Sequence, residues 1–189
     1  MDDRRGLSRE PPAATSAAER VRTVVSPAAA SGIDIRELRN ALGCFATGIT
    51  IVTARAADGQ VAGVTANSFC SVSLDPPLVL WCLAKSAPSG SVFVSATYFA
   101  IHVLAEDQAD LSARFSRPSK DKFAGLRMSP GLEGTPLLED AVAVFECRCE
   151  QRYDGGDHLI IVGRVERYRH TDRPPLLFHF GRYCGVGRP

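Results

Sequence analysis

Short polar side chains gather in the stretch TANSFCS, directly after an apolar run that is typical of a buried strand. Thr65, Asn67, Ser68 and Ser71 supply hydrogen-bond donors and acceptors on short side chains. A strand that ends in small residues also exposes backbone N–H groups, and together these groups suit a planar heterocycle with carbonyl and ring-nitrogen edges. The alternative is a polar turn whose side chains bond to its own backbone.

A second polar cluster follows the next apolar run, in CLAKSAPSG. Lys85, Ser86 and Ser89 can hold a phosphate together with free N–H groups at the start of a following helix. Arg117 and Lys122, in SRPSKDKFAG, add positive charge from a long loop. The alternative is that these lysines and serines are solvated residues at loop ends.

His158 stands beside a turn in the stretch DGGDH. It is either a turn histidine satisfied by Asp154 or Asp157, or part of a binding site. A general-base role lacks a visible nucleophile, because the sequence has no G-x-S-x-G serine. The four histidines have no metal-ligand spacing, and we expect no metal site.

Composition narrows the class of protein. A net charge of +1 over 189 residues gives no general attraction to nucleic acid or to an anionic membrane, and we expect neither partner. No apolar stretch approaches the ~20 residues of a membrane helix, and the N-terminus lacks the apolar core of a secretory signal. The six cysteines show no C-x-x-C spacing, which favours small buried thiols in a reducing cytoplasm over disulfides or zinc.

The chain divides into an arm and one domain. Residues 1–32 are rich in Ala, Pro, Arg and Ser without a period, which predicts a flexible N-terminal arm. The domain is expected at 33–189. It begins with an amphipathic helix that Asp34 can cap, and we expect the apolar face of this helix to be docked.

The domain pattern is dominated by strands. GITIVTAR and VAGVTANS flank a turn and predict a hairpin, PPLVLWCLA and YFAIHVLA read as single strands, and AVAVFECRCEQRY and HLIIVGRVERY form a second hairpin around DGGD. PSGSVFVSA and EDQADLSARFS predict short helices, and residues 117–140 a long loop. At least six strands with few helices, without β-α-β alternation, predict a closed or nearly closed antiparallel barrel.

The motifs TGITIVTA, ANSFCSVSLDPPLVLWCLAKS, DKFAG, DGGDHLIIVGRVE and PLLFHFGRY occur here in one order. In this respect the sequence resembles the short-chain flavin reductases over about residues 34–187. The resemblance implies a mainly β, antiparallel Greek-key, FMN-binding split barrel with a few peripheral helices. It also implies a homodimer with FMN or FAD near the interface.

The resemblance implies roles for particular residues. Along the flavin ring and ribityl chain it places Asn67, Ser68, Phe69, Cys70, Ser71, Ser73 and Leu74, with backbone N–H groups from Thr65 and Ala66 onward stabilising negative charge at N1 and O2. It places Ala84, Lys85 and Ser86 towards the phosphate, under a loop that carries Lys122 and Phe123. His158 and Tyr183 lie on the nicotinamide side, where His158 orients the amide. The chain departs from the family at His102, where Asn is common, and at APSG, where Arg or Thr is frequent.

The implied reaction is hydride transfer from C4 of NADH or NADPH to N5 of the flavin, which requires no acid–base pair from the protein. Reduced flavin is then supplied, by diffusion, to a partner flavin-dependent monooxygenase. One alternative is a split-barrel protein that binds flavin without turnover, although this chain keeps G-D-H. Another is a pyridoxine-phosphate-oxidase-like enzyme, which calls for more arginines around the phosphate.

Overall fold

A computed structural model describes residues 32–119 and 121–187. Nearly all of the predicted arm, residues 1–31, lies outside the described residues, and that prediction stays untested. The chain separates into two compact units, 1–38 and 39–189. In the described part, no helix is long and apolar enough to cross a membrane, and no three metal-ligating side chains cluster.

Helix α1 (Ile35–Leu42) forms where the apolar spacing predicts it. Asp34 caps it, because its Oδ1 accepts from the N–H of Arg36 at 2.8 Å and of Glu37 at 3.3 Å. However, the helix has no buried residue. The expectation that its apolar face is docked stays a prediction.

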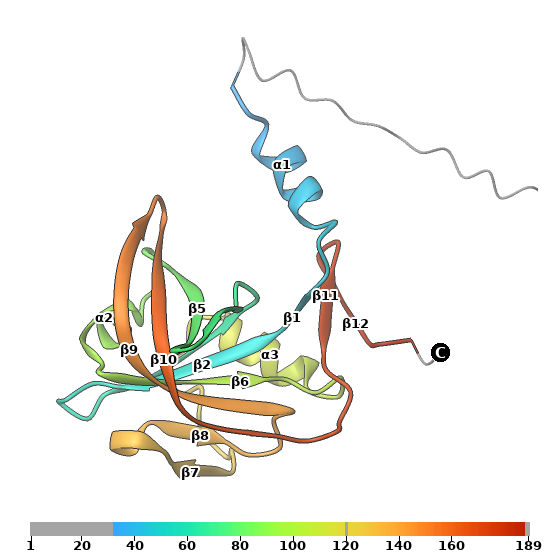
Figure 1. Ribbon diagram of the computed structural model, residues 1–189. Helices are drawn as coiled ribbons and strands as arrows, with labels where there is room; N and C mark the ends of the chain where they lie inside the picture. The colour runs from blue at the N-terminus through green and yellow to red at the C-terminus, as the bar shows by residue number, and fades with distance from the viewer. Residues whose placement is uncertain (1–31, 120, 188–189) are drawn as a thin grey trace, which may run out of the picture. The chain divides into compact units, whose positions relative to one another are not determined.

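Seven antiparallel strands form the main sheet, in the order β3-β2-β6-β9-β10-β5-β4 (Figure 1). They are β2 (Thr50–Arg55), β3 (Val61–Ala66), β4 (Cys70–Leu74), β5 (Pro77–Ala84), β6 (Tyr98–Val103), β9 (Ala143–Gly155) and β10 (His158–His170). The two outermost strands, β3 and β4, follow each other in the chain across only Asn67–Phe69. This short link requires the sheet to curl so that its two outer strands approach each other, as in a barrel. The mainly β, antiparallel prediction is confirmed.

The inside of the curled sheet holds the larger of the hydrophobic cores. Trp81 of β5 is fully buried, with its ring centroid 5.1 Å from that of Phe93 and 6.0 Å from that of Phe99. Gly163 of β10 lies so close to Phe99 that a Cβ there would stand 2.4 Å from the ring. A glycine at this position is what lets the aromatic ring approach the sheet.

Short elements surround the sheet. They are β1 (Thr47–Gly48), α2 (Gly90–Ser95), α3 (Ala109–Ser116), β7 (Met128–Pro130), the 3₁₀ helix η1 (Leu132–Gly134), β8 (Pro136–Leu138), β11 (Leu177–His179) and β12 (Arg182–Cys184). β1, β11 and β12 form a three-stranded sheet, and β7 pairs with β8. The long loop predicted at 117–140 thus contains two strands. Three residues bounded by Pro and Gly are too few to show a strand period, and the sequence pattern missed them.

The long hairpin β9–β10 agrees with its alternating pattern, and its tip projects beyond the rest of the sheet (Figure 1). On its polar face Arg164 donates to Glu150 at 2.9 Å, which holds the pKa of that carboxyl below its usual range. Cys147, on the other face, is buried, and this burial raises its pKa to about 12. All six thiols are free, but Cys44, Cys70 and Cys184 are exposed, so the expectation of buried thiols is wrong for these three.

His102 is fully buried in β6 and ties two neighbouring strands together. Its Nδ1–H donates to the carbonyl of Ile51 in β2 at 2.9 Å, and its Nε2 accepts from the N–H of Leu138 in β8 at 3.1 Å. Burial lowers its pKa to about 4, and the ring is neutral. His102 therefore has a structural role.

Candidate functional site

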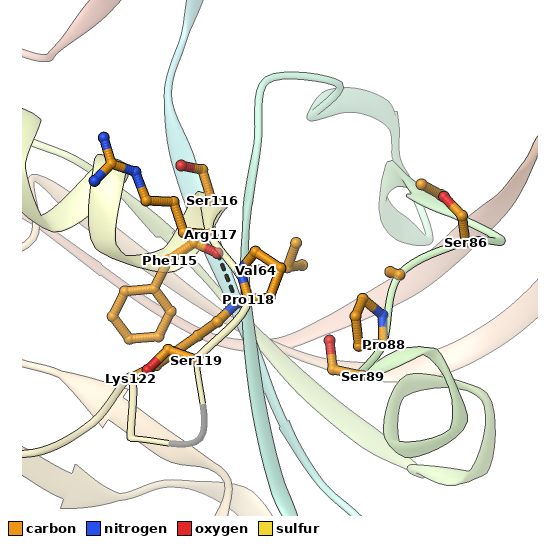
Figure 2. Close-up of a pocket in the computed structure, with 12 residues that line it drawn as sticks. Val64, Ser86, Pro88, Ser89, Phe115, Ser116, Arg117, Pro118, Ser119 and Lys122 are labelled. Atoms are coloured by element: carbon orange, nitrogen blue, oxygen red, sulfur yellow. Dashed lines mark hydrogen bonds between the residues drawn. The ribbon is translucent and has the colours of Figure 1, made fainter.

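A cleft of about 600 Å³ opens between the turn after β5 and the segment after α3 (Figure 2). Val64 of β3 lies between these two walls in the close-up. The lining residues are Val64, Ala84, Ser86, Ala87, Pro88, Ser89, Phe115, Ser116, Arg117, Pro118, Ser119 and Lys122. Of the residues predicted to bind flavin, Ala84, Ser86 and Lys122 are among them.

The first wall is the tetrapeptide SAPS at positions 86–89. Two successive tight turns shape it, since the N–H of Ala87 donates to the carbonyl of Ala84 at 3.0 Å and that of Gly90 to Ala87 at 2.9 Å. Ser89 occupies the N-cap position of α2, yet its hydroxyl makes no capping bond. The hydroxyl is thus left available to a ligand.

The second wall is the tetrapeptide SRPS at positions 116–119, after the end of α3. Lys122 fixes its base, because its Nζ donates to the carbonyl of Phe115 at 2.8 Å and to that of Gly63 at 3.1 Å. Burial lowers the pKa of this ammonium. Arg114 adds a second tie, with Nη2 donating to the carbonyls of Asp121 at 3.1 Å and Ala124 at 2.6 Å.

Aromatic rings brace the same wall from behind. Phe123 meets the buried Phe115 edge to face, with 5.2 Å between ring centroids. Both rings press on Gly63, where a Cβ would stand 2.3 Å from Phe115 and 3.0 Å from Phe123. Phe123 thus packs in the core behind the wall, and it is Lys122 that lines the cleft.

The link Asn67–Phe69 joins β4 to β3, the strand whose Val64 lines the cleft. The Ser68 hydroxyl accepts from the N–H of Cys82 at 2.8 Å and lies 3.3 Å from its carbonyl, which ties the link to β5. Phe69 packs on Phe145 with ring centroids 5.5 Å apart. Asn67 is exposed, and the link lies outside the strand pairing, which leaves its backbone N–H groups free of the sheet ladder.

Strand β4 carries the remaining residues predicted along the ribityl chain. Cys70, Ser71 and Leu74 are exposed, and Ser73 is half-buried. Leu74 is 94% exposed, which is unusual for a leucine. None of these four side chains lines the cleft of this single chain.

The tip of the β9–β10 hairpin lies next to the first wall, since His158 pairs with Ala84 across β10 and β5. The Nδ1 of His158 is 2.7 Å from Oδ1 of Asp157, and this hydrogen bond holds the pKa of the carboxyl below its usual range. The Lys85 ammonium pairs with Asp154 at 2.6 Å, and its backbone N–H donates to Asp157 at 2.9 Å. Lys85 therefore faces the hairpin and does not line the cleft.

Tyr183 lies elsewhere, against α3. Its hydroxyl is 2.9 Å from Oγ of the fully buried Ser112, whose carbonyl accepts from the Thr65 hydroxyl at 2.7 Å. Ala66 follows Thr65 and is buried at the end of β3. Among the described residues, no hydrogen bond or ion pair joins Tyr183 on β12 to His158 on β10.

Sequence reasoning missed most of the second wall, namely Phe115, Ser116, Pro118 and Ser119. A signal was present, because SAPS and SRPS share the pattern S-x-P-S. The chemistry of the cleft is mixed: Val64, Ala84, Ala87, Pro88 and Phe115 are apolar, and serine hydroxyls flank them. An apolar slot with a few polar groups fits a flat aromatic ring that carries a phosphate. The residues present thus fit a flavin.

Comparison with known proteins bears on the same region. The model of the family described as flavin reductase like domain matches residues 42–187. The chain is 51% identical to the FMN reductase (NADH) SmoA of Agrobacterium fabrum over 80% of this chain and 88% of that protein. It is 45% identical to the reductase component of the flavin-dependent trigonelline monooxygenase of Acinetobacter baylyi, over 79% of this chain but only 48% of that protein.

A solved structure gives the same picture. The NADH:FAD oxidoreductase SgcE6 of Streptomyces globisporus, in complex with NAD and FAD fragments, superimposes with a TM-score of 0.75 and 38% identity. The match covers 82% of this chain and 96% of that one. The likeness therefore extends over nearly the whole of the described domain.

Proposed function

Because the chain belongs to the flavin reductase like family, we propose that it is an NAD(P)H-dependent flavin reductase that transfers hydride from a nicotinamide to FMN or FAD. The observation that carries this proposal is the cleft of about 600 Å³, whose apolar lining and serine hydroxyls suit a phosphorylated flavin. When bound, the flavin accepts the hydride at N5, and this is chemistry that no side chain of the protein supplies.

The protein contributes placement. Val64, Ala84 and Phe115 offer apolar surface to a flat ring, and the N–H groups of the 67–69 link offer donors to its polar edge. Ser86 and Ser89 offer hydroxyls to the phosphate. Thr65 and Ser68 act indirectly in this proposal, since their hydroxyls are held by Ser112 and Cys82.

His158 orients the nicotinamide. Asp157 accepts the Nδ1–H of the ring at 2.7 Å, which leaves Nε2 as an acceptor for the amide N–H of a nicotinamide. His158 pairs with Ala84 at the edge of the cleft, so the two ligands can meet there. Hydride transfer needs stacked planes about 3–3.5 Å apart, and an orienting contact serves that requirement.

The partner is a flavin-dependent monooxygenase that uses the reduced flavin, as in the relatives named as reductase components.

We also propose a homodimer. Strand β4 is the last strand of the main sheet, and its Val72 and Leu74 are exposed apolar side chains. Apolar side chains on an edge strand favour burial against another chain. Light scattering tests this, with Leu74→Asp expected to shift the protein towards monomer.

Absorbance at 340 nm tests the enzyme. Purified protein is mixed with NADH or NADPH, with and without FMN, FAD or riboflavin. Flavin-dependent oxidation is expected and identifies the preferred pair of cofactors. Loss of flavin fluorescence without oxidation of either nicotinamide would instead indicate a flavin-binding protein without turnover.

A further inference from the structure

The two walls of the cleft differ in one respect that bears on ligand charge. Both have the sequence S-x-P-S, but the second residue is Ala87 on one wall and Arg117 on the other. The hydroxyls and prolines of the two segments thus offer similar groups from opposite sides (Figure 2). Arg117 supplies a charge that its counterpart lacks.

The other cations near the cleft are already engaged. Lys85, one of the cations that the sequence placed at the phosphate, pairs with Asp154 at 2.6 Å and does not line the cleft. Lys122 lines it, but its ammonium donates to the carbonyls of Phe115 and Gly63. Both bonds hold the Lys122 ammonium against the base of the second wall.

Arg117 is free by comparison. Across residues 32–119 and 121–187, no hydrogen bond or ion pair involves its guanidinium, and the side chain is exposed. In Figure 2 it extends away from the wall of Ser86 and Ser89. It can therefore turn towards a bound phosphate without breaking a contact, while its backbone stays close to the base fixed by Lys122.

A flavin monophosphate needs such a group. A phosphate monoester carries roughly −1.5 to −2 charges at pH 7, and hydroxyls donate to it without neutralising it. An arginine can form two parallel hydrogen bonds with phosphate oxygens and remains charged at any relevant pH.

We propose that Arg117 determines the preference of this protein for phosphorylated flavins, by binding the flavin phosphate across the cleft from Ser86 and Ser89. The proposal rests on the proposed function for the identity of the ligand. Of Lys85, Arg117 and Lys122, the three cations named from the sequence, Arg117 thus takes the role at the phosphate. Lys85 instead braces the hairpin that carries His158, through Asp154 and Asp157.

Flavin fluorescence titrations of the full chain with FMN and with riboflavin test the proposal, because only FMN carries the phosphate. Arg117→Gln is expected to raise the Kd for FMN by about tenfold. The Kd for riboflavin should stay within about twofold of wild type. Arg117→Lys is expected to recover part of the lost affinity for FMN, because lysine restores the positive charge but cannot form the two parallel hydrogen bonds of arginine.

Arg167→Gln is the matched control, because it removes the same charge from an exposed position on β10 that does not line the cleft. It should leave the ratio of the FMN and riboflavin constants unchanged, as should Lys85→Gln. An unchanged ratio in Arg117→Gln, or an equal loss in Lys85→Gln, overturns the proposal.

Steady-state kinetics separate the two possible sources of phosphate. Suppose that Arg117→Gln alters the ratio of the KM values for NADPH and NADH but not the ratio of the KM values for FMN and riboflavin. Arg117 then binds the phosphate of the nicotinamide nucleotide, and the proposal is wrong. The titrations require no turnover. They therefore decide the role of Arg117 even if the wild-type protein oxidises neither nicotinamide.

Discussion

Acid titration of His102 should control the stability of this fold between pH 6.5 and 4. The ring is fully buried and neutral, and it holds β2 and β8 through Ile51 and Leu138. Burial lowers its pKa from 6.5 to about 4, whereas the unfolded chain keeps the ordinary value. The folded protein therefore excludes a proton that the unfolded chain binds.

The sign and size follow from this difference. Above pH 6.5 neither state binds the proton, and the contribution of His102 to stability is fully present. As the pH falls below 6.5, the unfolded state is favoured by up to about 1.4 kcal/mol per pH unit. The loss ends near pH 4, where the folded protein also binds the proton, at a total of about 3 kcal/mol.

Urea unfolding at a series of pH values measures the effect, with Trp81 as the probe because it is the only tryptophan and is fully buried. His102→Asn serves as the variant, since an amide can donate and accept but does not titrate. Whatever its stability at neutral pH, the variant should lose less free energy of unfolding than wild type below pH 6.5, by up to about 1.4 kcal/mol per pH unit. His170→Asn, at an exposed histidine, is the matched control.

Carboxylates also titrate near pH 4, and for that reason the difference between wild type and variant carries the conclusion. If the free energy of unfolding of His102→Asn falls with pH in parallel with that of wild type, the buried ring is not the source of the acid sensitivity. The same holds if His170→Asn shows the shallower decline instead.

Three further substitutions have distinct expected results. Gly163→Ala should destabilise the fold by about 1–3 kcal/mol, because the new Cβ would stand 2.4 Å from Phe99; urea unfolding measures this. Ser68→Ala should cost about 1–2 kcal/mol of stability, because it removes the bond to the N–H of Cys82, while the FMN-to-riboflavin preference stays unchanged in titrations. His158→Ala should raise the KM for the nicotinamide and leave the Kd for flavin nearly unchanged, and equal loss of both would mean that the residue is structural.

The sequence predicted those elements whose pattern is local and repeated. The β9–β10 hairpin alternates apolar and charged residues over many positions around a glycine turn, and the structure has it there. The strands β7 and β8 contain three residues each, too few for any period to appear. For α1 the pattern gave the helix correctly, but a local pattern cannot say what covers its apolar face.

The candidate site shows the same difference between local patterns, which the sequence reveals, and tertiary contacts, which it does not. Polar residues after β5 marked the first wall, since small hydroxyl residues directly after an apolar strand are visible in the sequence. The role of Lys85 was not visible, because its partner Asp154 stands 69 residues away and reaches it only through the long β9–β10 hairpin. The role of a lysine depends on the group that it contacts in the fold, and its neighbours in sequence do not reveal that group.

The pair SAPS and SRPS shows where local pattern and tertiary contact meet. Each segment by itself is an ordinary loop, and thirty residues separate their positions in the sequence. The curled sheet and the two carbonyl bonds of Lys122 set them on opposite sides of one cleft. Once they face each other, the arginine of one segment, where the other has alanine, gives one wall a charge that the other lacks. Selection for a phosphorylated ligand then depends on a side chain that forms no part of the fold, which leaves Arg117 open to change without loss of stability.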